Sequence, residues 1–201
     1  MPPEAKLAEL PAIESDGRRQ RTERTRVAVV EALYELMEEG NLVPTAQELA
    51  DKAGIGLRTY FRRFKSTEEL FECFDAHFRP DYEELIWGGK RTGDFEERIH
   101  NAVEHFTDCF ASQRNIMLST HTFLWRSPVI SRLYTHTLAT LRESVESFLP
   151  ELKELSKSDR EAAHAVISFE MWHRLKVHQN LSKKKSREVM EMVLRTLLIG
   201  N

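Results

Sequence analysis

Apolar residues recur every three or four positions along most of this chain, and that spacing constrains its fold more than any other feature. A period of 3.6 residues is typical of an α-helix with one buried face, and no stretch alternates polar and apolar residues as a strand does. Glycine and proline separate the periodic stretches. We therefore predict an all-α fold. The expected helices span residues 22–39, 45–53, 56–64, 66–79, 95–112, 116–125, 129–148, 159–180 and 183–199.

Three Ser/Thr-x-x-Glu patterns predict where helices begin. In such a capping box the first hydroxyl accepts a hydrogen bond from a free N–H of the first turn, and the glutamate accepts one from the N–H of the capping residue. The patterns start at Thr45, Ser66 and Ser158. Gly54 follows the first of these helices, and glycine readily takes the left-handed conformation that ends a helix.

Length and composition limit the classes of protein to which the chain can belong. Its 201 residues allow one domain or two small ones, and 41% hydrophobic with 30% charged residues is typical of a globular protein. No run of about 18 apolar residues could cross a membrane, and the N-terminal MPPEAKLAEL lacks the basic start and apolar run of a signal peptide. Cys73 and Cys109 are too few for a small secreted fold held by disulfides. We expect a cytoplasmic protein with no membrane partner.

The net charge of −3 is unevenly divided along the chain. Residues 1–16 carry one basic and four acidic residues, residues 17–65 carry ten and seven, and residues 66–201 carry 18 and 21. A basic segment inside an acidic chain indicates a polyanionic partner for residues 17–65. A solvated charged face is the alternative that charge alone leaves open.

Residues 45–64, TAQELADKAGIGLRTYFRRF, carry the pattern with the clearest chemistry. Two short predicted helices are joined by a glycine turn, and the first offers the small Ala50 to the second. The second helix carries three bulky aromatic residues, Tyr60, Phe61 and Phe64. This arrangement is typical of a helix-turn-helix, whose second helix lies in the major groove of DNA, and Arg58 and Arg62 share one face of that helix. The alternative, a plain hairpin in an all-α core, rarely needs three arginines on so short a helix.

Residues 22–71 resemble the DNA-binding domain of the TetR family of bacterial transcriptional regulators. The resemblance is carried by Ala53-Gly54-Ile55, Thr59-Tyr60-Phe61, Phe64 and Glu68-Glu69-Leu70-Phe71. It implies a helix-turn-helix domain followed by a divergent all-helical domain that binds a small molecule and dimerises through its last two helices. Beyond residue 71 the chain matches the family only in length and helical character.

Four positions depart from the usual family pattern. Gly56 stands where serine is frequent, Phe61 where tyrosine is, Arg63 where histidine or tyrosine is, and Thr67 where lysine is. Phe61 cannot donate the hydrogen bond to phosphate that a tyrosine would donate. Arg63 and Lys65 can supply contacts to the DNA backbone in its place.

The residues expected to contact DNA lie on the predicted second helix of the motif, beside it, and at the start of the first long helix. They are Arg24, Thr45, Leu57, Arg58, Thr59, Phe61, Arg62, Arg63 and Lys65. The stretch from Arg18 to Arg26 contains five bases and suits contacts with phosphates or with the minor groove. A disordered solubilising tail would have the same composition.

These observations predict three regions and a function. We expect a flexible basic arm at residues 1–20, a helix-turn-helix DNA-binding domain at residues 21–66, and a ligand-binding and dimerisation domain at residues 67–201. The implied protein is a homodimeric repressor that a small-molecule ligand releases from a palindromic operator in double-stranded DNA.

The C-terminal region carries two sets of residues that fit these roles. An apolar cavity for a small apolar or amphipathic effector would use the aromatic and soft residues of the middle helices, which are Phe106, Cys109, Phe110, Met117, His121, Phe123, Trp125, Tyr134 and Trp172. A two-fold four-helix interface would use the apolar faces of the last two helices, which carry Ile167, Met171, Leu175, Val189, Met190, Val193, Leu194, Leu197 and Leu198. Core packing would explain either set without a ligand or a partner.

A helical-bundle carboxylate di-metal enzyme is the alternative function. Glu97 with His100 and Glu170 with His173 form two Glu-x-x-His pairs on separate predicted helices, the spacing with which such bundles hold their ions. That site needs two further bridging glutamates, for which the sequence offers no clear candidates. No serine-nucleophile motif, phosphate loop or Cys-x-x-Cys pair occurs. We therefore expect a protein that is not an enzyme, with no catalytic residues, no metal and no cofactor.

Overall fold

The structure, a computed structural model, describes residues 13–200, and over this range it contains helices and no strand. The predicted all-α fold is confirmed. The chain divides into two compact units, Met1–Cys73 and Phe74–Asn201. The division falls after residue 73 rather than after residue 66, because Glu69 and Cys73 both contact Arg26. No helix of the described range is long and apolar enough to cross a membrane.

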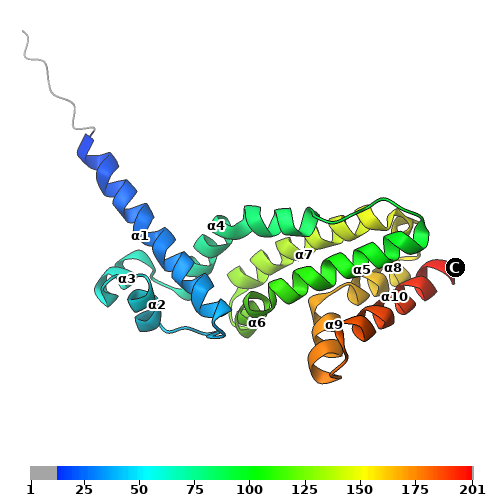
Figure 1. The fold of residues 1–201 in the computed structure, drawn as a ribbon. Coiled ribbons are helices and arrows are strands. Elements are labelled where there is room, and N and C mark those ends of the chain that lie inside the picture. Colours follow the sequence, from blue (N-terminus) through cyan, green and yellow to red (C-terminus); the bar gives the residue numbers. More distant parts are fainter. Residues whose placement is uncertain (1–12, 201) are drawn as a thin grey trace, which may run out of the picture. The chain divides into compact units, whose positions relative to one another are not determined.

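The N-terminal unit is a helix-turn-helix packed on a long helix (Figure 1). It contains α1 (Ile13–Glu38), α2 (Ala46–Lys52), α3 (Leu57–Arg63) and the first turns of α4 (Thr67–Trp87). Ala50 is fully buried, so α2 and α3 can approach closely. Gly54 has a φ of +66°, and this left-handed turn lets the N–H of Ile55 donate to the carbonyl of Ala50 at 2.9 Å.

The first helix begins earlier than expected. Residues 13–20, expected as part of a flexible arm, belong to α1, and the first part of that helix projects beyond α2 and α3 (Figure 1). Arginine, glutamine and glutamate are good helix formers, and no proline follows Pro11 until Pro44, so nothing in the sequence stops the helix at residue 20. Residues 1–12 of the expected arm lie outside the described residues.

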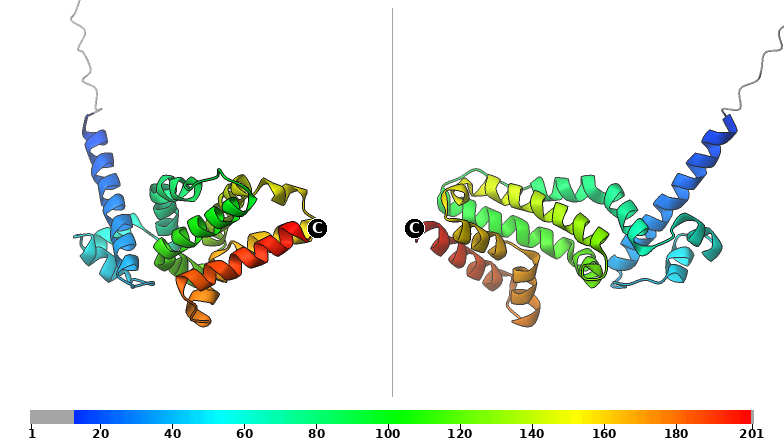
Figure 2. Two further views of the ribbon diagram at one scale, coloured as in Figure 1. Left: turned by 45° about the vertical axis from the view of Figure 1, so that its right-hand side comes forward. Right: turned by 180° about the vertical axis from the view of Figure 1, so that it is seen from behind.

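The C-terminal unit is a bundle of helices around one apolar core. It contains the rest of α4, α5 (Phe95–Ser112), α6 (Arg114–Phe123), α7 (Pro128–Phe148), the 3₁₀ segment η1 (Pro150–Glu154), α8 (Lys157–Val166), α9 (Phe169–His173), the π-helical segment η2 (Arg174–His178) and α10 (Lys183–Ile199). Helix α10 packs along α5 and against α8, as both views of Figure 2 show. Its inward side chains, Met190 and Leu194, are fully buried in the core.

Helix α4 continues through Pro80, where we expected it to end. The proline removes one backbone hydrogen bond from the helix, but side chains bridge the position. Arg79 pairs with the buried Asp75, and the Tyr82 hydroxyl donates to the same carboxylate at 2.5 Å. Burial of Ile86, nearly two turns after Pro80, also favours continuation, because its apolar surface leaves water.

The expected helix over residues 159–180 is instead broken after α8. The hydroxyl of Ser168 accepts a hydrogen bond from the N–H of Met171 at 3.2 Å and starts α9 as a separate helix. The predicted cap at Ser158 is also wrong, since Ser156 accepts from the N–H of Asp159 at 3.2 Å and begins α8 two residues earlier. At Ser66 only half of the predicted box forms, because the Glu69 carboxylate accepts from the N–H of Lys65.

We expect Leu194→Ala to lower the free energy of unfolding by about 2–5 kcal/mol, because it leaves a cavity in the core of the C-terminal unit. Met192→Ala, on the exposed side of the same helix, should change it by less than about 0.5 kcal/mol. Chemical denaturation followed by circular dichroism measures both. A loss at Leu194 that vanished at high protein concentration would place this side chain in an interface between copies instead.

Candidate nucleic-acid interface

Helix α3 presents a polar outer face and an aromatic inner face. Tyr60 and Phe64 are buried, with ring centroids 5.8 Å apart, and hold the helix to the unit's core. Arg58 and Arg62 are exposed. Phe61 does not pack inward with the other two aromatic residues, because it lies next to these arginines on the outer face and is 57% exposed. The outer face therefore combines two guanidinium groups with one apolar ring.

The two arginines of this face have no ion pair or hydrogen bond from their side chains to any described residue. The nearby Lys52, in contrast, pairs with Glu39 at 2.7 Å and Glu35 at 3.1 Å. The acidic residues at the end of α1 are thus matched by the lysine of α2. Arg58 and Arg62 keep their charge available to an anion, as contact with phosphates or guanine edges requires.

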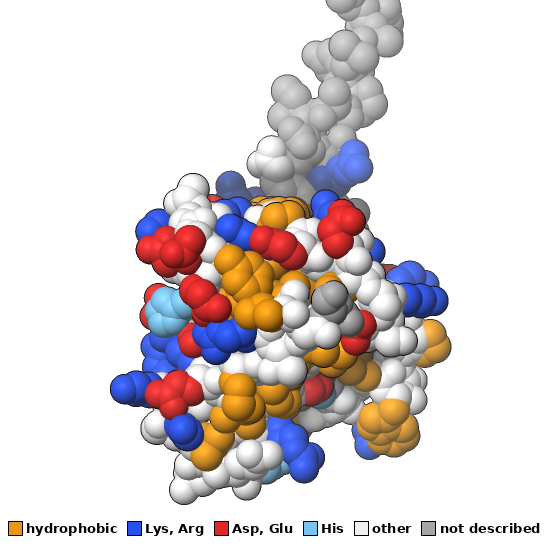
Figure 3. Space-filling view, turned by 90° about the vertical axis from the view of Figure 1, so that its right-hand side faces the viewer, with side chains coloured by type: hydrophobic (Ala, Val, Ile, Leu, Met, Phe, Trp, Pro, Cys, Tyr) orange, Lys and Arg blue, Asp and Glu red, His pale blue; other side chains and the backbone are white. Residues whose placement is uncertain are grey.

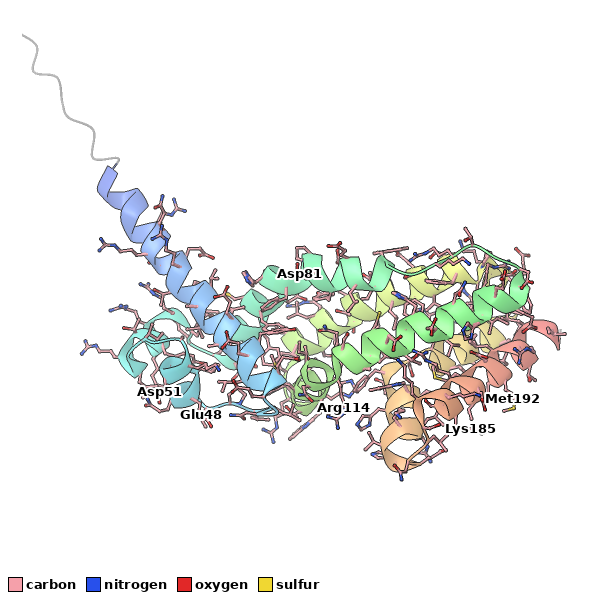
Figure 4. The ribbon with its side chains drawn as sticks, in the orientation of Figure 1. Glu48, Asp51, Asp81, Arg114, Lys185 and Met192 are labelled. Carbon is pink, nitrogen blue, oxygen red and sulfur yellow. The ribbon has the colours of Figure 1, made fainter. Side chains whose placement is uncertain are left out.

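The capping box that starts α2 forms as predicted. Thr45 donates from its N–H to Glu48 Oε2 at 2.7 Å, and its hydroxyl oxygen accepts from the N–H of Glu48 at 3.3 Å. The hydrogen bond from the Thr45 backbone is the largest of the effects that lower the pKa of Glu48. Figure 4 labels this glutamate on α2. The Thr45 hydroxyl, expected to contact DNA, also donates to Glu48 at 2.7 Å and so serves the cap.

Arg26 joins α1 to the end of α3 and the start of α4. Its Nη1 donates to the carbonyl of Arg63 at 3.1 Å and to Glu69 Oε1 at 2.9 Å, and its Nη2 contacts the sulfur of Cys73. The guanidinium also lies 4.9 Å from the centre of the Phe64 ring. We expected Arg26 only as one base of the arm, so its structural role was missed. A signal was present, because Arg26 lies one turn before Val30 on the apolar stripe of α1.

The pKa values of this pair shift in opposite directions. Burial on its own would lower the pKa of Arg26, but hydrogen bonds to Glu69 and Cys73 outweigh it and raise the pKa. The backbone N–H of Lys65 and the Arg26 guanidinium lower the pKa of Glu69. Both groups are therefore charged at neutral pH, and the pair fixes the end of α3 relative to α1.

Further basic residues surround α3. Arg24 and Lys65 are exposed, Arg63 is half-buried, and Leu57 and Thr59 are half-buried at the start of the helix. Arg19 and Arg21 are exposed on the projecting part of α1, whereas the side chain of Arg18 lies outside the described set. Those of the nine predicted DNA-contacting residues that belong to α3 lie close together, because the helix is short. Arg24 and Lys65 extend the basic surface within the same unit.

The residues predicted to line an effector cavity are divided between core and surface. Phe106, Cys109, Phe110 and Trp172 are buried, and burial raises the pKa of the Cys109 thiol to about 11, so that it stays protonated. Four others, Met117, His121, Phe123 and Tyr134, are half-buried. Trp125 cannot line a cavity, because it is 76% exposed with Arg126 4.4 Å above its ring. A cleft of about 550 Å³ lies elsewhere, between α7, α8 and α9, and contains none of the nine.

The residues predicted to form a dimer interface all lie in the chain's own core or pack against it. Four of them are buried in the chain's own core, namely Ile167, Leu175, Met190 and Leu194. Met190 and Leu194 are buried because α5 and α8 pack against the broad apolar face of α10. Val189, Val193, Leu197, Leu198 and Met171 are half-buried at the edge of this core.

Other apolar residues of α10 remain exposed. Met192 is 56% and Ile199 61% exposed, and Figure 4 shows Met192 pointing away from the helices. Figure 3 shows hydrophobic side chains in patches between charged ones on the face that it draws. The exposed side chains of Met192 and Ile199, rather than the buried Leu194, are available to a second copy.

The two Glu-x-x-His pairs of the enzyme alternative serve other interactions. Glu97 closes a capping box with Asp94, and His100 Nδ1 lies 2.8 Å from Glu191. Glu170 accepts a hydrogen bond from the Tyr134 hydroxyl at 2.8 Å. Within the described residues no three His, Cys, Asp or Glu side chains are grouped so that they could hold a metal ion.

Solved structures of transcriptional regulators share this fold. A transcriptional regulator from Rhodococcus sp. RHA1 superposes with a TM-score of 0.61 at 13% identity, over 89% of this chain and 96% of that chain. GusR of Salmonella enterica gives 0.62 at 14%, over 87% and 95%, and a TetR transcriptional regulator from Rhodococcus sp. RHA1 gives 0.59 at 16%, over 89% and 98%. No protein-family model matches the sequence, and no curated protein matches it. The resemblance stated for residues 22–71 thus extends, as a likeness of fold, over most of the chain.

We expect Arg26→Gln to destabilise the N-terminal unit by about 1–2 kcal/mol, because it removes a charged hydrogen-bond donor from Glu69 and from the Arg63 carbonyl. Both side chains are partly exposed, so water screens the ion pair and the loss is smaller than for a buried pair. Glu69 has a lowered folded pKa, so its contribution is present at neutral pH. It is lost as the pH falls below the ordinary glutamate value of about 4.3 towards the folded one.

Thermal unfolding at pH 7 and at lower pH measures this effect. The difference between wild type and Arg26→Gln should shrink on acidification. Arg24→Gln, which removes an exposed guanidinium from the same helix, serves as the matched control and should leave stability unchanged. Equal stability of all three proteins at pH 7 would show that the Arg26 contacts do not hold the unit together.

Proposed function

We propose that this chain, whose fold is that of TetR-type transcriptional regulators, is a DNA-binding repressor rather than an enzyme. The observation that carries the proposal is the outer face of α3, where Arg58 and Arg62 lie exposed and unpaired on the second helix of a helix-turn-helix. In that motif the second helix enters the major groove, so these guanidiniums would meet base edges and phosphates.

The remaining predicted residues would then orient α3 on the duplex. Lys65 and Arg24, both exposed, are suited to phosphates on either side of the groove, and the Phe61 ring can contact a thymine methyl group. Arg19 and Arg21 extend the basic surface along the projecting turns of α1. Sequence-independent attraction to the DNA backbone would come chiefly from these outer residues.

We further propose that the protein acts as a homodimer in the cytoplasm, on a palindromic operator, and that a small molecule releases it. A single short helix makes too few contacts for tight, specific binding, whereas two copies can reach successive major grooves about 34–36 Å apart. The exposed Met192 and Ile199, with the half-buried Val189 at the edge of the same face, supply the apolar surface for pairing. The cytoplasm is the compartment proposed because a bacterial repressor binds chromosomal DNA there.

We expect Arg58→Ala and Arg62→Ala each to weaken operator binding by about 1–3 kcal/mol, because each removes a guanidinium that can make a bidentate contact to guanine. The operator is first obtained as the DNA that the wild-type protein enriches from a random-sequence pool. Fluorescence anisotropy then compares it with unrelated DNA, to which binding should fall less. Lys184→Ala, in the C-terminal unit, controls for the loss of one positive charge and should bind as wild type does. Unchanged affinity in both arginine variants would contradict base contact by this helix.

We expect Met192→Glu to raise the dimer dissociation constant by about tenfold or more, because it places a carboxylate within an apolar interface. Its thermal stability as a monomer should stay close to wild type, since the residue is exposed. Sedimentation velocity over a range of concentrations measures the equilibrium, with Met192→Leu as the apolar control. A dimer of undiminished strength in Met192→Glu would move the interface away from the outer face of α10.

A further inference from the structure

The cleft between α7, α8 and α9 lies within the C-terminal unit and contains none of the residues that the function proposed above uses. Its volume of about 550 Å³ is within the range of roughly 300–1,000 Å³ that small-molecule sites occupy. The apolar part of its lining consists of Leu138, Leu141, Ala165, Ile167 and Met171. Such a surface favours the hydrocarbon portion of a ligand over water.

Two of the polar groups of the cleft already have partners. Arg142 makes two hydrogen bonds to the Glu161 carboxylate, at 2.8 and 2.7 Å, so that their charges cancel. His164 Nε2 lies 3.0 Å from Glu146. Burial lowers the pKa of His164 and keeps the ring neutral near pH 7. Neither Arg142 nor His164 leaves a net positive charge for a ligand.

Glu170 and Arg174 lie one helical turn apart on the same side of the cleft. The Glu170 carboxylate accepts from the Tyr134 hydroxyl at 2.8 Å and lies 3.5 Å from His121 Nε2, so it is drawn towards α6 and α7. Arg174 is exposed, and its side chain makes no hydrogen bond or ion pair to any residue from 13 to 200. Arg174 is thus the cation of the lining that no described carboxylate pairs with.

We propose that this cleft binds an amphipathic organic anion, whose hydrocarbon part lies on the apolar lining and whose carboxylate or sulfonate pairs with Arg174. The pairing is charge-assisted, and a planar guanidinium can hold both oxygens of a carboxylate. The identification of this ligand with the effector of the repressor rests on the proposed function, whereas the binding itself does not.

Decanoate, below its micelle-forming concentration, is the probe for isothermal titration with the full chain. It should bind saturably, and decyltrimethylammonium, with a similar chain and the opposite charge, should not. Arg174→Gln should weaken decanoate binding by about 10-fold or more, because the charged hydrogen bonds are lost. Arg174→Lys, which keeps the charge, should retain most of the affinity.

Three further variants separate the site from a general charge effect. Lys184→Gln removes an 89%-exposed cation outside the cleft and should bind decanoate as wild type does. Glu170→Gln removes the nearby negative charge and should strengthen binding. Ala165→Trp, at an exposed helical position that tolerates substitution, should fill the cleft and abolish binding while the circular dichroism spectrum stays unchanged.

Three results would overturn the inference: no saturable binding of decanoate, equal affinity in Arg174→Gln, or equally tight binding of decyltrimethylammonium. All are measured without DNA, so they are independent of the proposed function. A chain that binds decanoate but enriches no DNA contradicts the repressor and leaves the cleft site standing. A chain that enriches DNA but binds no decanoate contradicts the cleft site alone.

Discussion

Arg26 lies on α1 where it meets the end of α3 and the start of α4, and its guanidinium bonds to groups of both of these helices. Helix α3 is only seven residues long, and a helix of that length has little stability of its own. Its position depends on what packs around it. The buried rings of Tyr60 and Phe64 pack its inner face against the core of the unit. The Arg26 guanidinium donates to the carbonyl of Arg63, the last residue of α3, and pairs with Glu69 at the start of α4. The outward direction of Arg58 and Arg62 follows from these contacts.

The basic residues of the N-terminal unit therefore fall into two groups that the net charge does not distinguish. Arg26 and Lys52 are paired with glutamates and stabilise the unit. Arg58 and Arg62 lack such partners among the described residues and keep their full charge towards solvent. The same principle applies to the cleft of the C-terminal unit, where Arg142 is paired and Arg174 is not. In both units the cations available to an anion are those that the fold leaves without a carboxylate.

The packing of α10 determines how much apolar surface of the C-terminal unit stays exposed to a partner. Because α5 and α8 cover its apolar face, Met190 and Leu194 belong to the core of one chain. A helix that is apolar over a wide arc needs several neighbours, but the pattern does not say whether they come from the same chain or from another. Met192 and Ile199 lie outside that arc and remain exposed. A second copy would therefore meet a narrower surface than the apolar pattern indicates.

The sequence by itself determined the helical class, the helix-turn-helix and the basic face of α3, because these depend on period, caps and glycine turns that act within a few residues. The Thr45–Glu48 box and the Gly54 turn formed as predicted for this reason. Only the tertiary structure decided which side chains are buried, paired or free. The extension of α1, the passage of α4 through Pro80, the break at Ser168 and the roles of Arg26 and Leu194 all depend on contacts between segments far apart in the chain. A local pattern carries no information about distant partners, and burial and charge pairing are set by those partners.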